Sequence, residues 1–219
     1  MCYSGIDNMI AVILMAGSGI RLMPLTKNVP KGLLIIRDQT ILERLLNSCK
    51  LAGIDKCVVV TGYNYERVAE NTSIIGDICD VEIDLVCNEK YNLTGTAYSA
   101  YLGCKDLDDD VLLISGNLIL QDELISKMVS SDKSSILDDY GEFVGVTKIR
   151  KEDLDDFNYL LKYNYELDNL SDYDLVYSLL SECTSLEFVE TEDFKWIAIK
   201  THMDWDKAQL LVDDLNRSL

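Results

Sequence analysis

Proline, histidine and long apolar segments are scarce in this chain of 219 residues. Its only two prolines, Pro24 and Pro30, lie near the start, so no later proline marks a boundary to a second domain. The single histidine, His202, and the absence of any C-x-x-C pair argue against a zinc site. No apolar run is long enough to span a membrane, and Met9–Met15 is too short for a signal peptide.

Positive charge is also scarce. The chain has 20 Lys and Arg against 38 Asp and Glu, which gives a net charge of −18. Residues 1–100 carry 9 basic and 11 acidic side chains, whereas residues 101–219 carry 11 and 27. Such a field repels nucleic acids and anionic lipids, so we expect neither a nucleic acid nor a membrane as a partner. Any second ligand would have to be received by the acidic second half.

The cysteines are odd in number and widely spaced. They stand at positions 2, 49, 57, 79, 87, 104 and 183. We expect reduced, mostly buried thiols in a cytoplasmic protein, with Cys87 and Cys104 as core residues rather than nucleophiles. For His202, we expect a surface position at the start of the last helix rather than the role of a base.

Hydrophobic and charged contents of 48% and 26% are typical of a globular domain. Continuous apolar runs alternate with helical patterns, which predicts parallel strands covered on both faces. The fold class is therefore α/β, a three-layer α/β/α sandwich around a Rossmann-like, doubly wound, mostly parallel sheet. The predicted strands are Ile10–Met15, Cys57–Thr61, Val81–Cys87, Val111–Ser115, Glu142–Ile149 and Lys195–Lys200. The predicted helices are Ile41–Leu51, a short piece near Glu66–Glu70, Thr96–Gly103, one after Gln121, Lys151–Leu161, Asp172–Cys183 and Met203–Leu215.

The segment Met9–Leu34 is the most informative part of the chain. Its first strand runs into the glycine turn Gly17-Ser18-Gly19, and Arg21 and Lys31 follow. A turn after a strand leaves several backbone N–H groups free to bind a phosphate chain, and glycine lets a ligand approach the backbone. A guanidinium can then bind two phosphate oxygens, and the lysine adds a mobile positive charge. G-x-G alone is a weak signal, and neither the P-loop nor the dinucleotide pattern is present.

The full string, A-G-S-G-I-R-L, P-L-T and P-K-G-L-L, resembles the sugar-phosphate and phosphocholine nucleotidyltransferase family. The segments 38–44 (D-Q-T-I-L-E-R), 91–99 (Y-N-L-T-G-T-A-Y-S) and 196–208 (W-I-A-I-K-T-H-M-D-W-D-K-A) extend this resemblance over nearly the whole chain. The 91–99 form and the small size favour the phosphocholine and phosphonate cytidylyltransferase branch.

The resemblance implies a domain organisation and a set of ligand-binding residues. Residues 1–8 are expected to form a short leader, with Met1 or Met9 as the start, and residues 9–219 a single domain. Within it, residues 9–120 would bind the nucleotide and residues 121–219 the acceptor. The implied nucleotide-binding residues are Ala16, Gly17, Ser18, Gly19, Arg21, Lys31, Gly95, Thr96, Ala97 and Asn117. Gly95-Thr96 has a plainer interpretation as a helix cap.

The reaction that the resemblance implies is in-line attack by a phosphate or phosphonate oxygen on the α-phosphate of a nucleoside triphosphate, CTP above all. Pyrophosphate leaves, and catalysis rests on positioning and on cations. In the family two aspartates hold Mg²⁺ for this step. Here Asn117 and Lys200 stand at those two positions, so the expected metal site is in doubt. Asp108–Asp110 precede the strand and should lie at its far end.

Three hypotheses remain open. The protein is a nucleotidyltransferase in which Lys200, together with Arg21 and Lys31, neutralises phosphate directly. Alternatively, it binds a nucleotide or activated metabolite without turnover, as a pseudoenzyme or partner subunit. In the third, the pocket is degenerate and the fold serves assembly only, for instance as a homo-oligomer. Because the phosphate-loop residues persist, retained nucleotide binding ranks first.

The acceptor is expected to be a small phosphorylated or phosphonate compound, such as phosphocholine or aminoethylphosphonate. Tyrosines and carboxylates gather between residues 155 and 177, and such a mixture can hold an ammonium group. Tyr165 and Glu166 resemble an acceptor-side element of relatives. The tyrosines are Tyr159, Tyr163, Tyr165, Tyr173 and Tyr177, and the acidic residues are Asp155, Asp156, Glu166, Asp168, Asp172 and Asp174. A solvated helix face with half-buried tyrosines explains the same residues.

Overall fold

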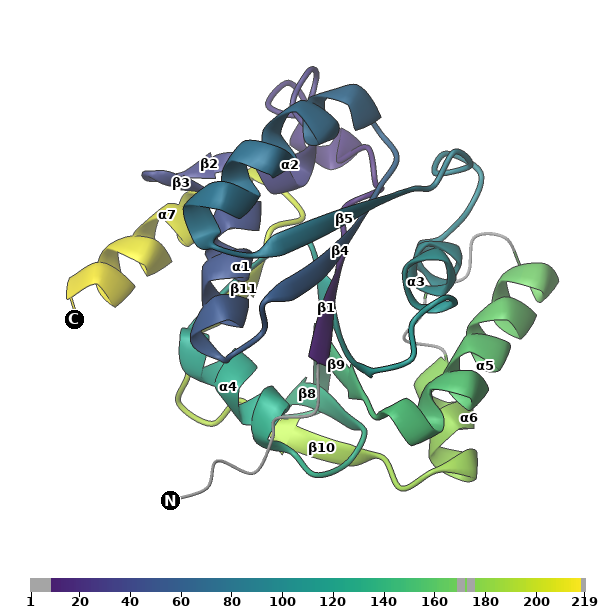
Figure 1. The fold of residues 1–219 in the computed structure, drawn as a ribbon. Coiled ribbons are helices and arrows are strands. Elements are labelled where there is room, and N and C mark those ends of the chain that lie inside the picture. The colour runs from purple at the N-terminus through teal and green to yellow at the C-terminus, as the bar shows by residue number, and fades with distance from the viewer. Residues whose placement is uncertain (1–8, 169–171, 173–175, 218–219) are drawn as a thin grey trace.

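A seven-stranded sheet forms the centre of the molecule (Figure 1). The computed structural model describes residues 9–168, 172 and 176–217; the expected leader, Tyr173 and Asp174 lie outside the described residues. The strand order is β10-β8-β9-β6-β1-β4-β5, and only β9 runs antiparallel to its neighbours. The strands are β1 (Met9–Leu14), β4 (Lys56–Thr61), β5 (Glu82–Cys87), β6 (Asp110–Ser115), β8 (Ser135–Asp139), β9 (Glu142–Ile149) and β10 (Glu187–Glu190).

Helices cover both faces of this sheet, so the predicted α/β/α sandwich with a mostly parallel sheet is confirmed. One face packs under α1 (Ile41–Leu51), α2 (Tyr65–Cys79), α4 (Asp122–Ser130) and α7 (His202–Arg217). The other packs under α3 (Thr96–Cys104), α5 (Leu154–Leu167) and α6 (Val176–Cys183). Successive side chains of the buried strands point into these two cores in turn, which is why the strands read as continuous apolar runs.

Two short antiparallel pairs flank the main sheet. The strands β2 (Ile35–Ile36) and β3 (Gln39–Thr40) form one pair, and β7 (Leu118–Leu120) and β11 (Trp196–Ala198) form the other. The predicted strand Lys195–Lys200 is observed as the shorter β11, and it pairs with β7 outside the main sheet. Three 3₁₀ turns complete the described elements, η1 (Ile20–Leu22), η2 (Lys31–Leu33) and η3 (Lys151–Asp153).

The second helix is longer than predicted. The sequence pattern suggested a short piece near Glu66–Glu70, but α2 continues to Cys79. Its buried positions include Val68, Thr72 and Ile75, which lie one turn apart along one face. The polar residue Thr72 interrupts the apolar positions of this face, so the helical period is not evident in the sequence. By contrast, α1 has the predicted bounds and begins with a capping box between Thr40 and Glu43.

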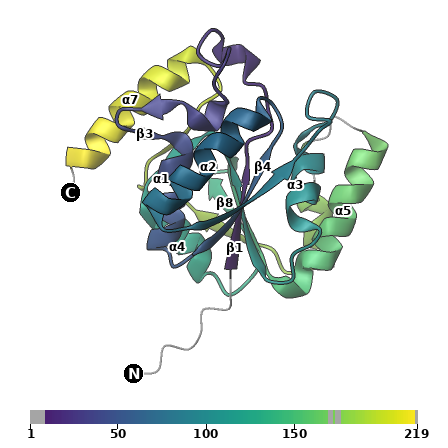
Figure 2. The same cartoon turned by 45° about the horizontal axis from the view of Figure 1, so that its top comes forward.

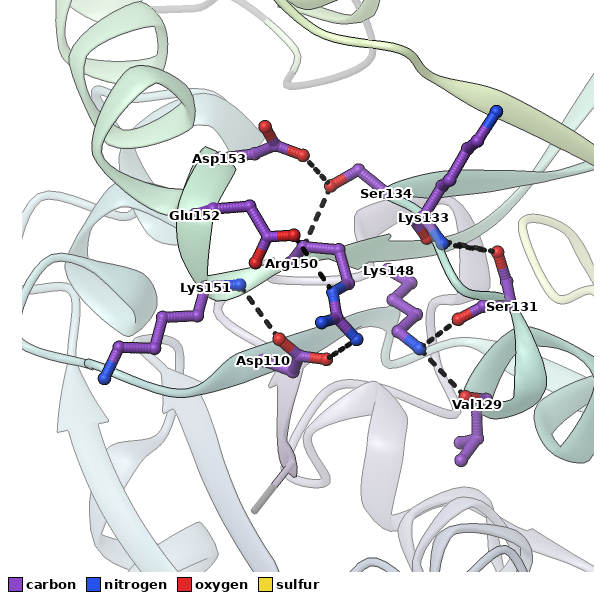
Figure 3. Close-up of polar contacts among 10 residues, drawn as sticks. All are labelled: Asp110, Val129, Ser131, Lys133, Ser134, Lys148, Arg150, Lys151, Glu152 and Asp153. Atoms are coloured by element: carbon purple, nitrogen blue, oxygen red, sulfur yellow. Dashed lines mark hydrogen bonds and ion pairs between the residues drawn. The ribbon is translucent and has the colours of Figure 1, made fainter. Parts of the chain in front are cut away.

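A polar network fixes the amino end of β6, far from the loop that follows β1 (Figure 3). Asp110 is buried, pairs with Arg150 at 3.0 Å and accepts the backbone N–H of Lys151 at 2.9 Å. Buried Lys148 donates to the carbonyls of Val129 and Ser131 at 2.8 and 2.5 Å, at the end of α4. As expected, Asp110 lies at the amino end of this strand and away from the carboxyl ends, where the metal site of the family was sought.

The described cysteines are free thiols. Cys49, Cys57, Cys79 and Cys104 are buried, as predicted, and burial raises the pKa of Cys104 to about 12. Cys87 is exposed, so its placement in the core is wrong: it ends β5 at the edge of the sheet, where no further strand covers it. None of the helices in the described ranges has the length and apolar content needed to cross a membrane.

Candidate functional site

The loop that follows β1 has a backbone shape that only glycine adopts readily at Gly19. Gly19 has φ of 63° and leads into η1, and its carbonyl accepts the hydroxyl of buried Thr26 at 2.8 Å. A Cβ atom at Gly19 would lie 2.9 Å from the Cγ2 of Thr26. On the other side, the N–H of Tyr63 donates to the carbonyl of Ala16 at 3.0 Å. The loop is thus held from two directions.

The amide groups of this loop remain available for a ligand. Across residues 9–168, 172 and 176–217, no protein group accepts a hydrogen bond from the N–H of Gly17, Ser18 or Gly19. Gly17 is exposed, and a Cβ atom there would meet nothing within 4 Å. Free amides beside open space at the end of a strand form the arrangement that binds phosphate oxygens.

A cavity of about 220 Å³ opens beside the loop, at the carboxyl ends of β1 and β6. In Figure 1, β1 rises from near the N-terminus and leads to the purple loop at the top of the molecule, where these strand ends lie. Six of the predicted binding residues line the cavity: Ala16, Gly17, Lys31, Gly95, Thr96 and Asn117. Ligand crevices of doubly wound sheets occur at this edge.

Ala97 and Tyr165 are placed differently. Ala97 is fully buried in the first turn of α3, so its side chain packs in the core. Tyr165 does not line the cavity: its ring packs on Tyr98 and Tyr101 of α3, with centroids 4.8 and 5.4 Å away. Glu166 is exposed beside it. Figure 2 shows the two helices, α3 and α5, side by side.

The segment 88–99 is shaped by a buried asparagine that the sequence did not single out. Asn88 donates to the hydroxyls of Thr94 and Ser99 at 3.1 and 3.0 Å, and its Oδ1 accepts the N–H of Lys90 at 2.9 Å. These bonds fix the turn that carries Gly95 to the cavity. A buried amide with three partners is a rigid anchor.

Lys31 lines the cavity, and two further cations, Arg21 and Lys200, lie close enough to act on its charge. The pKa of Lys31 is lowered to about 8, first by burial and then by the positive charges of Arg21 and Lys200. In the part of the chain that the structure describes, no carboxylate forms an ion pair with any of the three. Three unpaired positive charges in a protein with a net charge of −18 mark a site for an anion.

Close packing brings Lys31 to this position. Gly32 follows it in η2, and a Cβ atom there would lie 2.4 Å from the Cε of Met15. Glycine lets this turn pack closely against the side chain of Met15 at the end of β1, so the preceding lysine lies beside the loop.

The two positions that replace the expected metal ligands lie side by side. The N–H of Ile199 donates to the carbonyl of Asn117 at 2.8 Å, and Asn117 Nδ2 donates to the carbonyl of Ile199 at 3.2 Å. Lys200 follows directly and is exposed. The backbone N–H groups of Lys200 and Thr201 both donate to Asp204 Oδ2 in the first turn of α7, at 3.0 and 2.7 Å.

These residues do not fit a magnesium ion. Asn117 has one neutral carbonyl oxygen to offer, and a lysine ammonium has no acceptor. Asp172 lines the cavity and its Oδ1 accepts the hydroxyl of Thr96 at 2.9 Å, but it stands alone. Among the described residues, no three Asp, Glu, His or Cys side chains form a group that could hold a metal.

The sequence allowed two interpretations of the tyrosines and acidic residues between 155 and 177, an ammonium site or a solvated helix face, and the structure has features of both. Tyr159 and Tyr163 are exposed on α5 and stack on one another with centroids 6.5 Å apart, as on a solvated face. Tyr177 is buried. Asp172 is the acidic residue of this segment that reaches the cavity, and only the tertiary fold singles it out.

Size alone does not identify the site. A larger hollow of about 340 Å³ lies between α1, β7 and α7. Its one basic side chain among the described lining, Arg44, is already engaged by the carbonyl of Ile36 at 2.9 Å and by Asp38 at 2.7 Å. The smaller cavity is the one with unpaired cations and free amides.

Comparison with known proteins agrees with this geometry. A family model described as nucleotidyl transferase matches residues 10–153. The "Bifunctional protein GlmU" of Methanococcus aeolicus is 35% identical over 134 residues, which cover 58% of this chain and 29% of that protein. The choline-phosphate cytidylyltransferase of Streptococcus pneumoniae is 28% identical over 126 residues, or 58% of this chain and 52% of that protein. The chain thus matches about half or less of each relative's length.

Among solved structures, the CTP:phosphocholine cytidylyltransferase of Streptococcus pneumoniae superposes with a TM-score of 0.77 at 21% identity. The match covers 94% of this chain and 99% of that one. At this level of identity the likeness concerns the fold alone.

Proposed function

Because the chain belongs to the nucleotidyl transferase family, we propose that its cavity binds a nucleoside triphosphate, CTP in preference. In this proposal, the protein transfers the nucleotidyl group to a small phosphorylated or phosphonate acceptor, such as phosphocholine or aminoethylphosphonate, and releases pyrophosphate. The single observation that carries the proposal is the cavity of about 220 Å³ in which the loop, Lys31, Gly95–Thr96 and Asn117 meet.

Each part of the cavity has a task in this reaction. The amides of Gly17, Ser18 and Gly19 bind phosphate oxygens, and Arg21 and Lys31 add positive charge. The base lies against the backbone at Gly95 and Thr96. An oxygen of the acceptor attacks the α-phosphate in line, the bond to the bridging oxygen breaks, and the negative charge leaves with pyrophosphate. Cations fixed beside the departing oxygens lower the barrier.

The acceptor is proposed to enter on the side of Asp172, Tyr165 and Glu166. A carboxylate that lines the cavity and an aromatic ring nearby suit the ammonium group of phosphocholine or aminoethylphosphonate. The proposal for Tyr165 and Glu166 is indirect, since neither lines the cavity: they would act from the edge of α5.

Binding without turnover is the second candidate function. The observation in its favour is the pair Asn117 and Lys200, which does not fit a magnesium ion. The protein would then act as a nucleotide-binding regulatory or partner subunit, or as a homo-oligomer of the same fold. We place either activity in the cytoplasm, where the free thiols of the described cysteines stay reduced.

The two functions separate in one assay. The protein is incubated with CTP or UTP and with phosphocholine or aminoethylphosphonate, with and without Mg²⁺, and pyrophosphate is measured. Pyrophosphate that depends on both substrates supports transfer. No release, together with a CTP-dependent rise in melting temperature, supports binding alone. No release and no thermal shift with any triphosphate would contradict both.

A double variant shows whether catalysis was lost through the two replaced positions. If Asn117→Asp with Lys200→Asp releases pyrophosphate only with Mg²⁺ while the parent protein is inactive, the binding function is favoured for the native chain. If the parent protein is active and the double variant is not, Lys200 serves the native reaction.

A further inference from the structure

The segment that carries Lys200 is tied to the rest of the chain at two points. On one side, paired hydrogen bonds join Ile199 to Asn117, which lines the cavity. On the other, His202 Nε2 lies 2.8 Å from the carbonyl of Met23, in the turn that follows Arg21. Lys200 stands between these two anchors, so the backbone that carries it is fixed between Asn117 and the turn that follows Arg21.

No carboxylate among the described residues forms an ion pair with Arg21, Lys31 or Lys200. The positive charges of Arg21 and Lys200 both act on Lys31, and the described carboxylate of the cavity, Asp172, accepts a hydrogen bond from Thr96. Like charges held together without counter-charge destabilise the unliganded protein. An anion with several negative charges relieves this repulsion, and a polyphosphate is such an anion.

A divalent cation would worsen the same repulsion. It would lie beside the ammonium group of Lys200 with a single neutral amide oxygen, from Asn117, as its protein ligand. A triphosphate that arrives with a bound divalent ion also brings less negative charge for the three side chains to neutralise. The three side-chain cations and a metal ion would therefore neutralise the same negative charge of the triphosphate.

We propose that Arg21, Lys31 and Lys200 together take the place of a divalent metal, so that this cavity binds the triphosphate of a nucleotide free of metal. The inference rests on the proposed function, because it concerns how the same nucleotide is held. It adds that the binding step needs no metal ion, and that Lys200 contacts the phosphates as the third cation.

Calorimetric titration with CTP and with inorganic tripolyphosphate tests the inference, once in EDTA and once in Mg²⁺ at equal ionic strength. We expect the dissociation constants in EDTA to be equal to or lower than those in Mg²⁺. Binding that occurs only with Mg²⁺ would overturn the inference and leave the proposed function intact. No binding of either compound in either buffer would contradict the proposed function itself, and the inference with it.

Matched lysine variants locate the effect. Lys200→Met should weaken tripolyphosphate binding in EDTA by about tenfold, the size of one charge-assisted contact. Lys56 lies at the amino end of β4, and the cavity lies at the carboxyl ends of the strands. Lys56→Met should therefore leave the affinity for tripolyphosphate unchanged. Equal affinities of the parent protein and Lys200→Met in EDTA would overturn the inference. Circular dichroism of each variant confirms that it is folded.

The double variant Asn117→Asp with Lys200→Asp provides the converse test. It replaces an amide and an ammonium group with two carboxylates, which suit Mg²⁺ and repel free phosphate. Its affinity for CTP should be more than about tenfold lower in EDTA than in Mg²⁺. Equal affinities in the two buffers would show that these positions do not decide the metal requirement.

Discussion

The two glycines of the loop differ in backbone conformation and in surroundings. Gly19 has a left-handed backbone and a close neighbour, Thr26, whereas Gly17 has open space where a side chain would project. We predict that Gly19→Ala lowers the free energy of unfolding by roughly 1–2 kcal/mol, because of its positive φ. Gly17→Ala should change it by less than about 0.5 kcal/mol, as at most surface sites.

For nucleotide binding, we expect Gly17→Ala to have the larger effect of the two substitutions. The methyl group of Gly17→Ala projects into the space where the phosphates are proposed to lie, so CTP should bind about tenfold more weakly. Urea denaturation gives the stabilities and calorimetry gives the affinities. A Gly17→Ala protein that binds CTP as well as the parent would show that the ligand does not approach this backbone.

Lys31 is expected to lower the stability of the unliganded protein and to contribute to CTP binding. Its pKa of about 8 in the folded protein lies below the ordinary lysine value of 10.5, so folding penalises the charged form. This penalty is fully present below about pH 8 and disappears as the pH rises toward 10.5. Lys31→Met should therefore stabilise the unliganded protein at pH 7, by on the order of 1–2 kcal/mol, and lose CTP binding.

The pH dependence provides the check on Lys31. The stability advantage of Lys31→Met over the parent protein, measured by urea denaturation, should shrink between pH 8 and pH 10. CTP affinity of the parent protein should fall over the same range, because the ammonium is lost while Arg21 remains charged. An advantage that grows with pH would contradict the assigned cause.

At the scale of residues, the sequence is most informative where the local backbone decides the outcome. The loop glycines and Lys31 were singled out from the strand-and-turn pattern, and Asn117 from the family resemblance. Gly17, Lys31 and Asn117 line one cavity, and their part in binding stays a prediction. Asn88 and Asp172 were not identified as site residues because their partners are set by tertiary contacts. Cys87 was misplaced because β5 reads as a buried strand but lies at the edge of the sheet.

At the scale of elements, the strands with continuous apolar runs were predictable and the acidic one was not. β8 contains Asp138 and Asp139, which a sequence pattern assigns to a loop. In the fold, Asp139 accepts the indole N–H of Trp196 at 2.9 Å and the hydroxyl of Thr191 at 2.6 Å. Partners more than fifty residues away make an acidic strand stable, and no local pattern reveals them.

The network at the amino end of β6 joins this strand to β9 and to the turn before α5 (Figure 3). Removing Arg150 leaves the carboxylate of Asp110 buried without its counter-charge. Arg150→Met should lower the free energy of unfolding by about 3 kcal/mol, as for other broken buried pairs. Lys151→Met is the matched control: its side chain is exposed and pairs only with exposed Asp108.

Urea denaturation measures both variants. A loss for Lys151→Met as large as that for Arg150→Met would contradict the assignment to the buried pair. This network lies at the amino ends of the strands, whereas the cavity lies at their carboxyl ends. The folded Arg150→Met protein should therefore bind CTP with the affinity of the parent.

At the scale of the whole molecule, the net charge of −18 and the local positive site make opposite demands on salt. Salt screens the self-repulsion of the acidic protein, so the melting temperature should rise between 20 and 500 mM NaCl, over which the screening length shortens about fivefold. Salt also screens the attraction between the three cations and a triphosphate, so CTP affinity should fall over the same range.

Thermal denaturation and calorimetry across this salt series provide the two readouts. Sucrose at matched osmolality is the control, because it carries no charge. CTP affinity that is independent of salt would contradict an electrostatic site, whatever the melting temperature does.

The crystal structure of the protein with CTP tests the central claim most directly. The account predicts phosphates against the amides of Gly17, Ser18 and Gly19 and within reach of Lys31, with the base at Gly95 and Thr96. Density for CTP in the hollow between α1 and α7, with the loop empty at saturating nucleotide, would contradict it.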